Sequence, residues 1–381
     1  MKSIVGIFLL GLLTAGLVVQ NQTTQTIDIT QPDINIGSIT PKVFDHLEHT
    51  RPLITTVEFI EAIEINPIGS TVGDFRFDRG GNIYFTSTDP ATTDPRAMGV
   101  SILRFDKQKK EQKEVPMEGI LKEEEGKELA WQCYDVDNFG NVYVGISHWT
   151  STVPRHIFVL NVEGDVISKF DLPNFLPYSI AVDDSENIWI AGESFSTENA
   201  NTKGARGQGQ IRVYDKEGNL IAIPVGGFKP EDIASGSFVE DGPKIKFILQ
   251  GETGTIYNFN GIQLADVWSY PLQQQSTNTS KHLLGLIGSD NYAVWHGAYI
   301  NQASQEPFMM LISLAGDRLT SENKLMIKSK RSFIPAGADK ESNIYFLSGE
   351  QGKTLLRRAK IHLTKSHLNK KTEQIQFINY E

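Results

Sequence analysis

Hydrophobic and polar residues alternate in short runs along most of the chain, and turns rich in Asp, Asn and Gly separate the runs. The segment FRFDRGGNIYFTSTD, from Phe75 to Asp89, contains two such runs on either side of a Gly-Gly-Asn turn. Alternation with a period of two around a tight turn predicts a β-hairpin. We therefore expect a protein built mainly from antiparallel strands.

The hairpin pattern apolar-Asp-x-x-Gly-Asn-apolar-aromatic recurs along the chain with variations. The acidic residues that mark its six copies are 46 to 59 residues apart: Asp78, Asp137, Asp183, Glu240, Asp290 and Asp339. A second hairpin follows each copy, so one repeat comprises four strands. A repeat of about 50 residues with four strands is typical of a propeller blade. The sequence therefore predicts an all-β fold, a six-bladed β-propeller of four-stranded antiparallel blades.

The repeats also predict the domain organisation. A strand at Thr56–Ile65 precedes the first copy, and we expect it to pair with the last blade, because closure of the ring removes exposed sheet edges. Residues 56–381 would then form one propeller domain, preceded by a polar linker or arm at 21–55. The acidic insert Glu118–Leu129 is interpreted as a short helix between the first two blades.

The N-terminus has the pattern of a targeting signal. Lys2 precedes an uncharged run from Ile4 to Val19, which as a helix spans about 24 Å, less than the ~30 Å hydrocarbon core of a bilayer. Residues 1–20 are therefore predicted to be a secretory signal peptide, with an uncleaved N-terminal anchor as the alternative. We expect an exported protein, periplasmic or extracellular, or one anchored to the membrane. The single cysteine, Cys133, excludes an intrachain disulfide.

Charge limits the possible partners. The 381 residues carry a net charge of −10, which repels polyanions and excludes an electrostatic surface for nucleic acid. Contact with a membrane is expected only through the N-terminal segment. The remaining partners are an unidentified small ligand or protein.

One repeat supports a resemblance to known proteins. The segment PYSIAVDDSENIWIA, from Pro177 to Ala191, followed by IRVYDKEGNLI, resembles an NHL repeat. From Val57 onward the chain resembles the NHL-repeat, regucalcin-like and TolB-like six-bladed propellers. The resemblance implies the propeller fold and leaves several functions open, because such propellers include ligand binders, protein binders, lactonases and lyases.

The resemblance also implies where a lactonase would hold its catalytic groups. In the regucalcin-like group, a Glu-Gly-Pro segment supplies a metal-binding carboxylate and a Pro-Asp-Gly segment supplies the acid that transfers a proton. The matching positions here are Val72-Gly73-Asp74 and Pro177-Tyr178-Ser179. Both carboxylates are missing in register, so a lactonase of that type is disfavoured. No cofactor is predicted, although zinc or calcium would suit the enzymatic alternative.

Candidate binding residues are expected on the face opposite the Asp turns, where long loops such as HWTSTVPRH leave the second strands. They combine acidic, amide, aromatic and cationic side chains: Asp74, Gln132, His148, Trp149, Arg155, Tyr178, Glu193, Asp232, His282 and His296. His148, His282 and His296 are also weak candidates for the three zinc ligands of a lyase. We do not predict a bound metal at these residues.

These observations favour a non-catalytic ligand- or protein-binding module that uses the loop-rich face. The alternative is a metal-dependent hydrolase, lactonase or lyase with its site at the channel mouth on the same face. No catalytic residue is assigned.

Overall fold

The computed structural model describes residues 42–43, 53–68, 71–88, 100–126, 129–148, 155–195, 207–241, 244–249, 253–271, 279–287, 292–300, 305–313, 322–328, 333–339, 341, 343–365 and 375–379. The predicted signal segment 1–20, most of the arm 21–55 and most of the predicted long loops lie outside these residues. Neither helix of the described ranges is long and apolar enough to cross a membrane.

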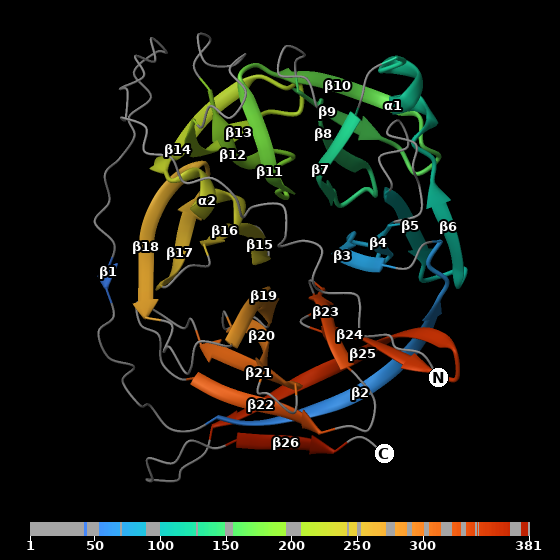
Figure 1. Ribbon diagram of the computed structural model, residues 1–381, viewed down its shortest axis with the longest axis vertical. Coiled ribbons are helices and arrows are strands. Elements are labelled where there is room, and N and C mark those ends of the chain that lie inside the picture. Colours follow the sequence, from blue (N-terminus) through green and yellow to red (C-terminus); the bar gives the residue numbers. More distant parts are fainter. Residues whose placement is uncertain are drawn as a thin grey trace.

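The described strands form six sheets, which we number in chain order (Figure 1). Sheet 1 contains β3 (Thr71–Phe77), β4 (Ile83–Thr88), β5 (Val100–Asp106) and β6 (Glu111–Val115). Sheet 2 contains β7 (Leu129–Val136), β8 (Val142–His148), β9 (Arg155–Leu160) and β10 (Val166–Leu172). Sheet 3 contains β11 (Phe175–Val182), β12 (Ile188–Ser194), β13 (Gln208–Tyr214) and β14 (Leu220–Phe228).

The second half of the chain repeats this organisation. Sheet 4 contains β15 (Ser237–Asp241), β16 (Lys244–Leu249), β17 (Thr253–Asn260) and β18 (Gln263–Pro271), with β1 (Lys42–Val43) added at its edge. Sheet 5 contains β19 (Thr279–Ile287), β20 (Tyr292–Ile300), β21 (Gln305–Ser313) and β22 (Glu322–Lys328), with β26 (Ile375–Asn379) at its edge. Sheet 6 contains β23 (Phe333–Ala338), β24 (Asn343–Glu350), β25 (Lys353–Lys365) and β2 (Leu53–Ile65).

The sheets surround a common centre with their first strands innermost (Figure 1). Each innermost strand contacts the next one around the ring, in the cycle β3, β7, β11, β15, β19, β23 and back to β3. Neighbouring strands are antiparallel in all sheets, except for the parallel edge strands β1 and β26. The fold is therefore a β-propeller of four-stranded antiparallel blades, as predicted.

The ends of the chain join different sheets. β2 pairs antiparallel with β25, from Leu53 opposite Lys365 to Ile65 opposite Thr354. This pairing confirms the prediction that the strand at 56–65 joins the last repeat. Two short pieces of the predicted arm are also in sheets, since β2 begins at Leu53 and β1 pairs with β18.

Apolar side chains fill the space between neighbouring sheets at the four junctions whose side chains the structure describes. Between sheets 1 and 2, Tyr84, Ile102, Val144 and Phe158 are buried in one cluster. Corresponding clusters lie between sheets 2 and 3, sheets 3 and 4, and sheets 6 and 1. The strands of a blade are covered by apolar groups on both faces, which is why β8 and β12 are buried along their whole length.

Two short helices connect sheets. α1 (Glu118–Glu123) lies in the predicted acidic insert and buries Ile120 in the cluster between sheets 1 and 2. α2 (Pro230–Ala234) begins with proline at its first position, which suits the fixed φ of that residue, and packs against sheet 3. The prediction of a helix within Glu118–Leu129 is therefore confirmed.

The hydrogen bonds of the Asp turns explain why Asp, Asn and an aromatic residue recur at the same spacing in the repeat. In the turn after β11, Asp183 accepts hydrogen bonds from the backbone N–H of Ser185 and Asn187, from the Asn187 side chain and from the Trp189 indole, at 2.9 to 3.0 Å. The same arrangement joins Asp137 to Asn141 and Tyr143, and Asp339 to Asn343 and Tyr345. We call the end of the ring that carries these turns the turn face, and the opposite end the loop face.

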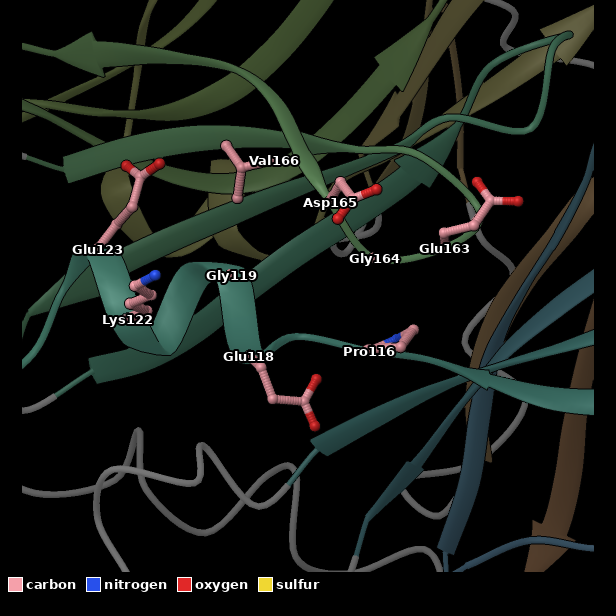
Figure 2. A pocket seen from close by; sticks show the side chains of 9 residues that line it. All are labelled: Pro116, Glu118, Gly119, Lys122, Glu123, Glu163, Gly164, Asp165 and Val166. Atoms are coloured by element: carbon pink, nitrogen blue, oxygen red, sulfur yellow. The ribbon is translucent and has the colours of Figure 1, made fainter.

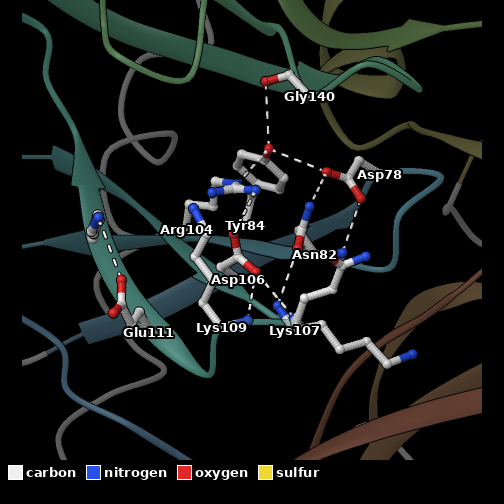
Figure 3. Close-up of polar contacts among 11 residues, drawn as sticks. Asp78, Asn82, Tyr84, Arg104, Asp106, Lys107, Lys109, Glu111 and Gly140 are labelled. Carbon is white, nitrogen blue, oxygen red and sulfur yellow. Dashed lines mark hydrogen bonds and ion pairs between the residues drawn. The ribbon is translucent and has the colours of Figure 1, made fainter.

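One of these turns also links two sheets. The Tyr84 hydroxyl lies 3.3 Å from Asp78 Oδ2 and 3.4 Å from the carbonyl of Gly140 in the next turn, and Arg104 Nε donates to it (Figure 3). Gly140 has φ of 87°, and a β-carbon there would approach the Tyr84 oxygen to 2.8 Å. Glycine at this turn therefore satisfies both the left-handed backbone and the close contact between sheets.

Candidate functional site

Three candidate residues lie at bulges of the innermost strands on the loop face. The pairing register shifts between Trp131 and Cys133, which leaves Gln132 without an opposite residue on β8. Tyr178 is skipped in the same way on β11, and Asp74 lies within the corresponding shift of β3. A bulge redirects the side chain of the extra residue. Sequence reasoning selected these positions, and the shared bulge explains why their side chains do not follow the strand alternation.

The three residues have different surroundings. Asp74 is exposed, has φ of 45°, and its carbonyl accepts a hydrogen bond from the Tyr134 hydroxyl. Gln132 donates to the Ser147 hydroxyl at 2.7 Å. Tyr178 donates to Glu193 Oε2, also at 2.7 Å. Asp74 therefore contributes its backbone to the contact between sheets 1 and 2, whereas Gln132 and Tyr178 present polar side chains.

A cation, a phenol and a buried carboxylate come together where sheets 2 and 3 meet the loop face. Glu193, near the end of β12, is 1% exposed and accepts hydrogen bonds from Tyr178 and from the backbone N–H of Gly207 at 2.5 Å. Arg155, the first residue of β9, lies with its guanidinium carbon 4.9 Å from the centre of the Phe195 ring. We call Arg155, Tyr178, Glu193 and Phe195 the arginine site.

Burial determines the electrostatics of the arginine site. Burial lowers the pKa of Arg155, and the nearby Glu193 and Tyr178 oppose that shift. A guanidinium has so high an unperturbed pKa that it stays charged at neutral pH. The site therefore presents a permanent cation that is partly removed from water, stacked on an aromatic ring and close to a carboxylate.

A second polar group lies inside sheet 2, under the C-terminal end of α1. It comprises Glu124, His148 and His156, whose ligand atoms all lie within 4.8 Å of one another. Glu124 Oε2 is 3.6 Å from His148 Nε2, and Glu124 Oε1 is 3.6 Å from His156 Nε2. The three side chains are 0%, 1% and 6% exposed, in that order. We call them the Glu-His-His cluster.

Strand register explains how the cluster forms. His156 pairs with Ile146 on β8 and with Asp171 on β10. His148 is two residues beyond Ile146, so the side chains of His148, His156 and Asp171 project from the same face of sheet 2. Glu124 follows α1 and reaches this face from the connection to sheet 1.

Charged groups surround the cluster. His156 Nδ1 is 2.7 Å from Asp171 Oδ1, and Lys169 Nζ is 2.6 Å from Glu124 Oε1. Burial, reinforced by the positive charge of Lys169, lowers the pKa of the His156 imidazole, while Asp171 and Glu124 oppose the shift. The ring is therefore largely neutral at pH 7, and its hydrogen bond to Asp171 places the proton on Nδ1.

The three predicted histidines lie in two different sheets. His148 lies with His156 and Glu124 in sheet 2. His282 and His296 lie opposite each other in the register of β19 and β20, in sheet 5. Sheets 2 and 5 are on different sides of the ring (Figure 1). Of the predicted histidines, only His148 therefore belongs to the cluster in the described part of the chain.

Two further predicted site residues, Asp232 and Trp149, belong to neither group. Asp232 is exposed in the first turn of α2, and Trp149 lies outside the described residues. Glu124 and His156 were missed. His156 had a usable signal, because His148 and His156 flank one hairpin loop in HWTSTVPRH, whereas nothing distinguished Glu124 from the other acids of its insert.

A cavity of about 610 Å³ lies at the outer edge of sheet 2, between α1 and the turn after β9 (Figure 2). Four of its nine lining residues are acidic (Glu118, Glu123, Glu163 and Asp165), and Lys122 is the cation among them. None of the predicted candidates lines it, and it lies away from the arginine site.

Comparisons with known proteins identify no family. No protein-family profile and no curated protein matches the sequence. Among solved structures, a protein of unknown function from Dyadobacter fermentans DSM 18053 is similar at a TM-score of 0.48 and 8% identity, over 81% of this chain and 99% of that one. A prolyl endopeptidase is similar at 0.43 and 9% identity, over 75% of this chain and 39% of the peptidase. AofleA from Arthrobotrys oligospora is similar at 0.42 and 10% identity, over 86% and 96% of the two chains.

The resemblance to the NHL-repeat, regucalcin-like and TolB-like propellers stays a prediction, since no family profile supports it.

Proposed function

We propose that this chain is an exported, six-bladed β-propeller that binds a small ligand or a peptide without catalysis, through the arginine site on its loop face. Each of the six sheets would be one blade. The closed cycle of contacts between the six innermost strands supports that count. The sequence of residues 1–20 supports export. A measurement of the mass of the mature protein, recovered from the cells that produce it, tests this prediction.

The observation that carries the binding proposal is the position of Arg155. A guanidinium presents its donors in a planar fork that matches a carboxylate, and partial burial strengthens such contacts. Here the guanidinium already stacks on Phe195, which reduces the conformational freedom lost when a ligand binds. The partly exposed Tyr178 hydroxyl lies beside it and can accept a hydrogen bond from another polar atom of the ligand, and the buried Glu193 carboxylate holds Tyr178 in place. We therefore propose a ligand that carries a carboxylate, such as a short peptide.

No comparable observation favours the metal-dependent hydrolase, lactonase or lyase. The positions where the regucalcin-like group would hold its two acids carry Val72 and Tyr178. The Glu-His-His cluster is too buried to admit a substrate, because its three side chains are at most 6% exposed. A catalytic metal keeps an open coordination position that a substrate can reach.

A screen of dipeptides and small carboxylic acids tests the proposal. We expect some of these compounds to raise the melting temperature of the full chain, because binding to the folded state alone stabilises it. Arg155→Gln should weaken their binding about 10- to 100-fold, since charge-assisted hydrogen bonds contribute about 1.5–3 kcal/mol. Mass spectrometry of the bound compounds should find them unchanged.

Arg79→Gln is the matched control, because Arg79 is exposed in a turn on the opposite face. Binding that survives Arg155→Gln as well as it survives Arg79→Gln would contradict the proposed site. A screen without any binding compound would contradict the ligand class, and chemical conversion of the compounds would favour the enzymatic alternative.

A further inference from the structure

The Glu-His-His cluster has the composition of a metal site. It offers two imidazoles and one carboxylate, a set of donors that suits zinc and other first-row divalent cations. All three side chains are buried, and they come from three separate parts of the chain: the end of α1, β8 and β9. We propose that Glu124, His148 and His156 bind one zinc ion, which joins α1 to the outer part of sheet 2.

The distances between the side chains agree with this assignment. Each carboxylate oxygen of Glu124 is 3.6 Å from the Nε2 atom of one histidine. That separation is too long for a hydrogen bond. Zinc bonds of about 2.0–2.2 Å in a tetrahedron place neighbouring ligand atoms about 3.4 Å apart. A carboxylate and two imidazoles could therefore enclose a zinc ion with small side-chain adjustments.

The orientation of His156 provides a second, independent observation. Its Nδ1 atom is 2.7 Å from Asp171 Oδ1, and this contact directs the other ring nitrogen, Nε2, toward Glu124. His156 Nε2 is buried and has no hydrogen bond to any described residue. A metal ion bound between Nε2 and the Glu124 carboxylate would give this buried nitrogen a partner. Metal-bound histidines at zinc sites also commonly donate their other ring nitrogen's proton to a carboxylate, as His156 can to Asp171.

Among the residues that the structure describes, Lys169 opposes a metal at the cluster. Its ammonium group lies 2.6 Å from Glu124 Oε1, and its side chain is 27% exposed. It therefore competes with zinc for one carboxylate oxygen, and its charge repels the ion. Because the side chain is partly exposed, it can move toward solvent and toward Glu123, which lies 3.6 Å from it. The site should bind zinc more weakly than it would without this lysine.

The burial of the cluster indicates a structural role for the ion. The three protein ligands leave one position of a tetrahedron for a water molecule, enclosed between α1 and sheet 2. Bound zinc would connect the segment between sheets 1 and 2 to two strands of sheet 2. This role is separate from ligand binding at the arginine site, so either proposal can fail without the other.

Zinc titration of the full chain tests the site. After treatment with a chelator, the protein is titrated with Zn²⁺ in competition with a metal-sensitive dye. We expect one equivalent to bind and to raise the melting temperature. His156→Gln and Glu124→Gln should each lower the affinity by more than about 100-fold. Asp171→Asn should lower it about 10- to 100-fold, because it loses only the carboxylate that contacts His156 Nδ1 and orients the ring.

Two further variants distinguish zinc binding at the Glu-His-His cluster from zinc binding elsewhere on the chain. His282→Gln is the matched control and should bind zinc as the wild type does, because its strand belongs to sheet 5. Lys169→Met should bind zinc at least about 10-fold more tightly, since it removes a positive charge next to the ion. A gain of affinity cannot result from a damaged fold.

The spectrum of the cobalt-substituted protein identifies the ligands even if a variant fails to fold. Co²⁺ in a tetrahedral site with two imidazoles should give strong visible absorption that Zn²⁺ displaces. A folded wild-type chain that binds no zinc, or zinc binding that persists in folded Glu124→Gln and His156→Gln, would overturn the proposal. Loss of zinc in His282→Gln alone would place the metal elsewhere and would also overturn it.

Discussion

The two faces of the propeller use polar side chains in different ways. On the turn face, Asp183 finds all four of its hydrogen-bond donors within the next six residues. On the loop face, Glu193 is bound by residues 14 and 15 positions away, and Glu124 meets His148 and His156 from a different sheet connection. The hydrogen bonds of the turn face join residues that are close in sequence, so the same turn recurs from sheet to sheet. The contacts on the loop side join residues that are far apart in sequence, so each site there differs from the others.

The residues of the turn face also differ from sheet to sheet, because some copies of the repeat keep the Asp, Asn and aromatic residue and others do not. Sheets 1, 2, 3 and 6 have Asp, Asn and an aromatic residue at the same spacing in their first turn. Sheet 4 has Glu240 and Lys244 in the places of the Asp and the Asn, and Lys246 in the place of the aromatic residue, and its strands β15 and β16 still pair. The combination of Asp, Asn and an aromatic residue in the first turn is therefore not required for the strands of a blade to pair.

The first prediction tests whether the turn face is a stability element. Asp183→Ala removes the acceptor of four hydrogen bonds and leaves the Trp189 indole and two backbone N–H groups without their partner. The Trp189 side chain is buried, and a buried donor that loses its acceptor is costly, so we expect the free energy of unfolding to fall by about 3 kcal/mol. Equilibrium unfolding in urea measures the change.

Asp215→Ala is the control for this prediction. Asp215 accepts from Asn219 in the outer hairpin of the same sheet, but the turn is exposed to solvent. Water can replace the lost carboxylate there, so the midpoint should shift much less. Equal shifts in the two variants would mean that the inner turns have no special role.

The second prediction concerns alkaline pH and the loop side of sheet 4. The ring of Tyr257 lies 5.2 Å from that of Phe228, and Asp232 of α2 is close to the hydroxyl. Burial, and next the charge of Asp232, raises the pKa of Tyr257 from 10.0 to about 12. Between these pH values the unfolded chain loses this proton and the folded chain keeps it. Stability should therefore decrease as the pH rises from 10 to 12.

The size of the alkaline effect can be isolated with Tyr257→Phe. A shift of about 2 pKa units corresponds to about 2–3 kcal/mol, which is an upper limit for this group. We expect the wild type to lose up to about 2 kcal/mol relative to Tyr257→Phe over that range, as measured by urea unfolding at a series of pH values. Parallel curves for the two proteins would show that Tyr257 is not buried as described.

The same contrast explains what could be predicted from the sequence. The Asp, Asn and aromatic residues of a turn are within seven positions of one another, so their spacing predicts both the hairpin and the repeat. Gln132 and Tyr178 lie at bulges of innermost strands, and their role in ligand binding stays a prediction. The Glu-His-His cluster was not predicted, because it depends on which face of sheet 2 α1 covers. The grouping of His148 with His282 and His296 stays a prediction.

Asp74 gives the smallest expected effect and tests whether a residue on the loop face acts through its backbone. Its φ of 45° lies in the left-handed region, where glycine is unstrained, Asp is tolerated and β-branched residues are unfavourable. We expect Asp74→Gly to stay within about 0.5 kcal/mol of the wild type and Asp74→Val to lose about 1–2 kcal/mol in urea unfolding. Both variants remove the exposed carboxylate, so only the backbone requirement distinguishes them. Equal stability of the two would contradict that requirement. A loss of carboxylate-ligand binding in Asp74→Gly, without loss of stability, would instead make Asp74 part of the binding surface.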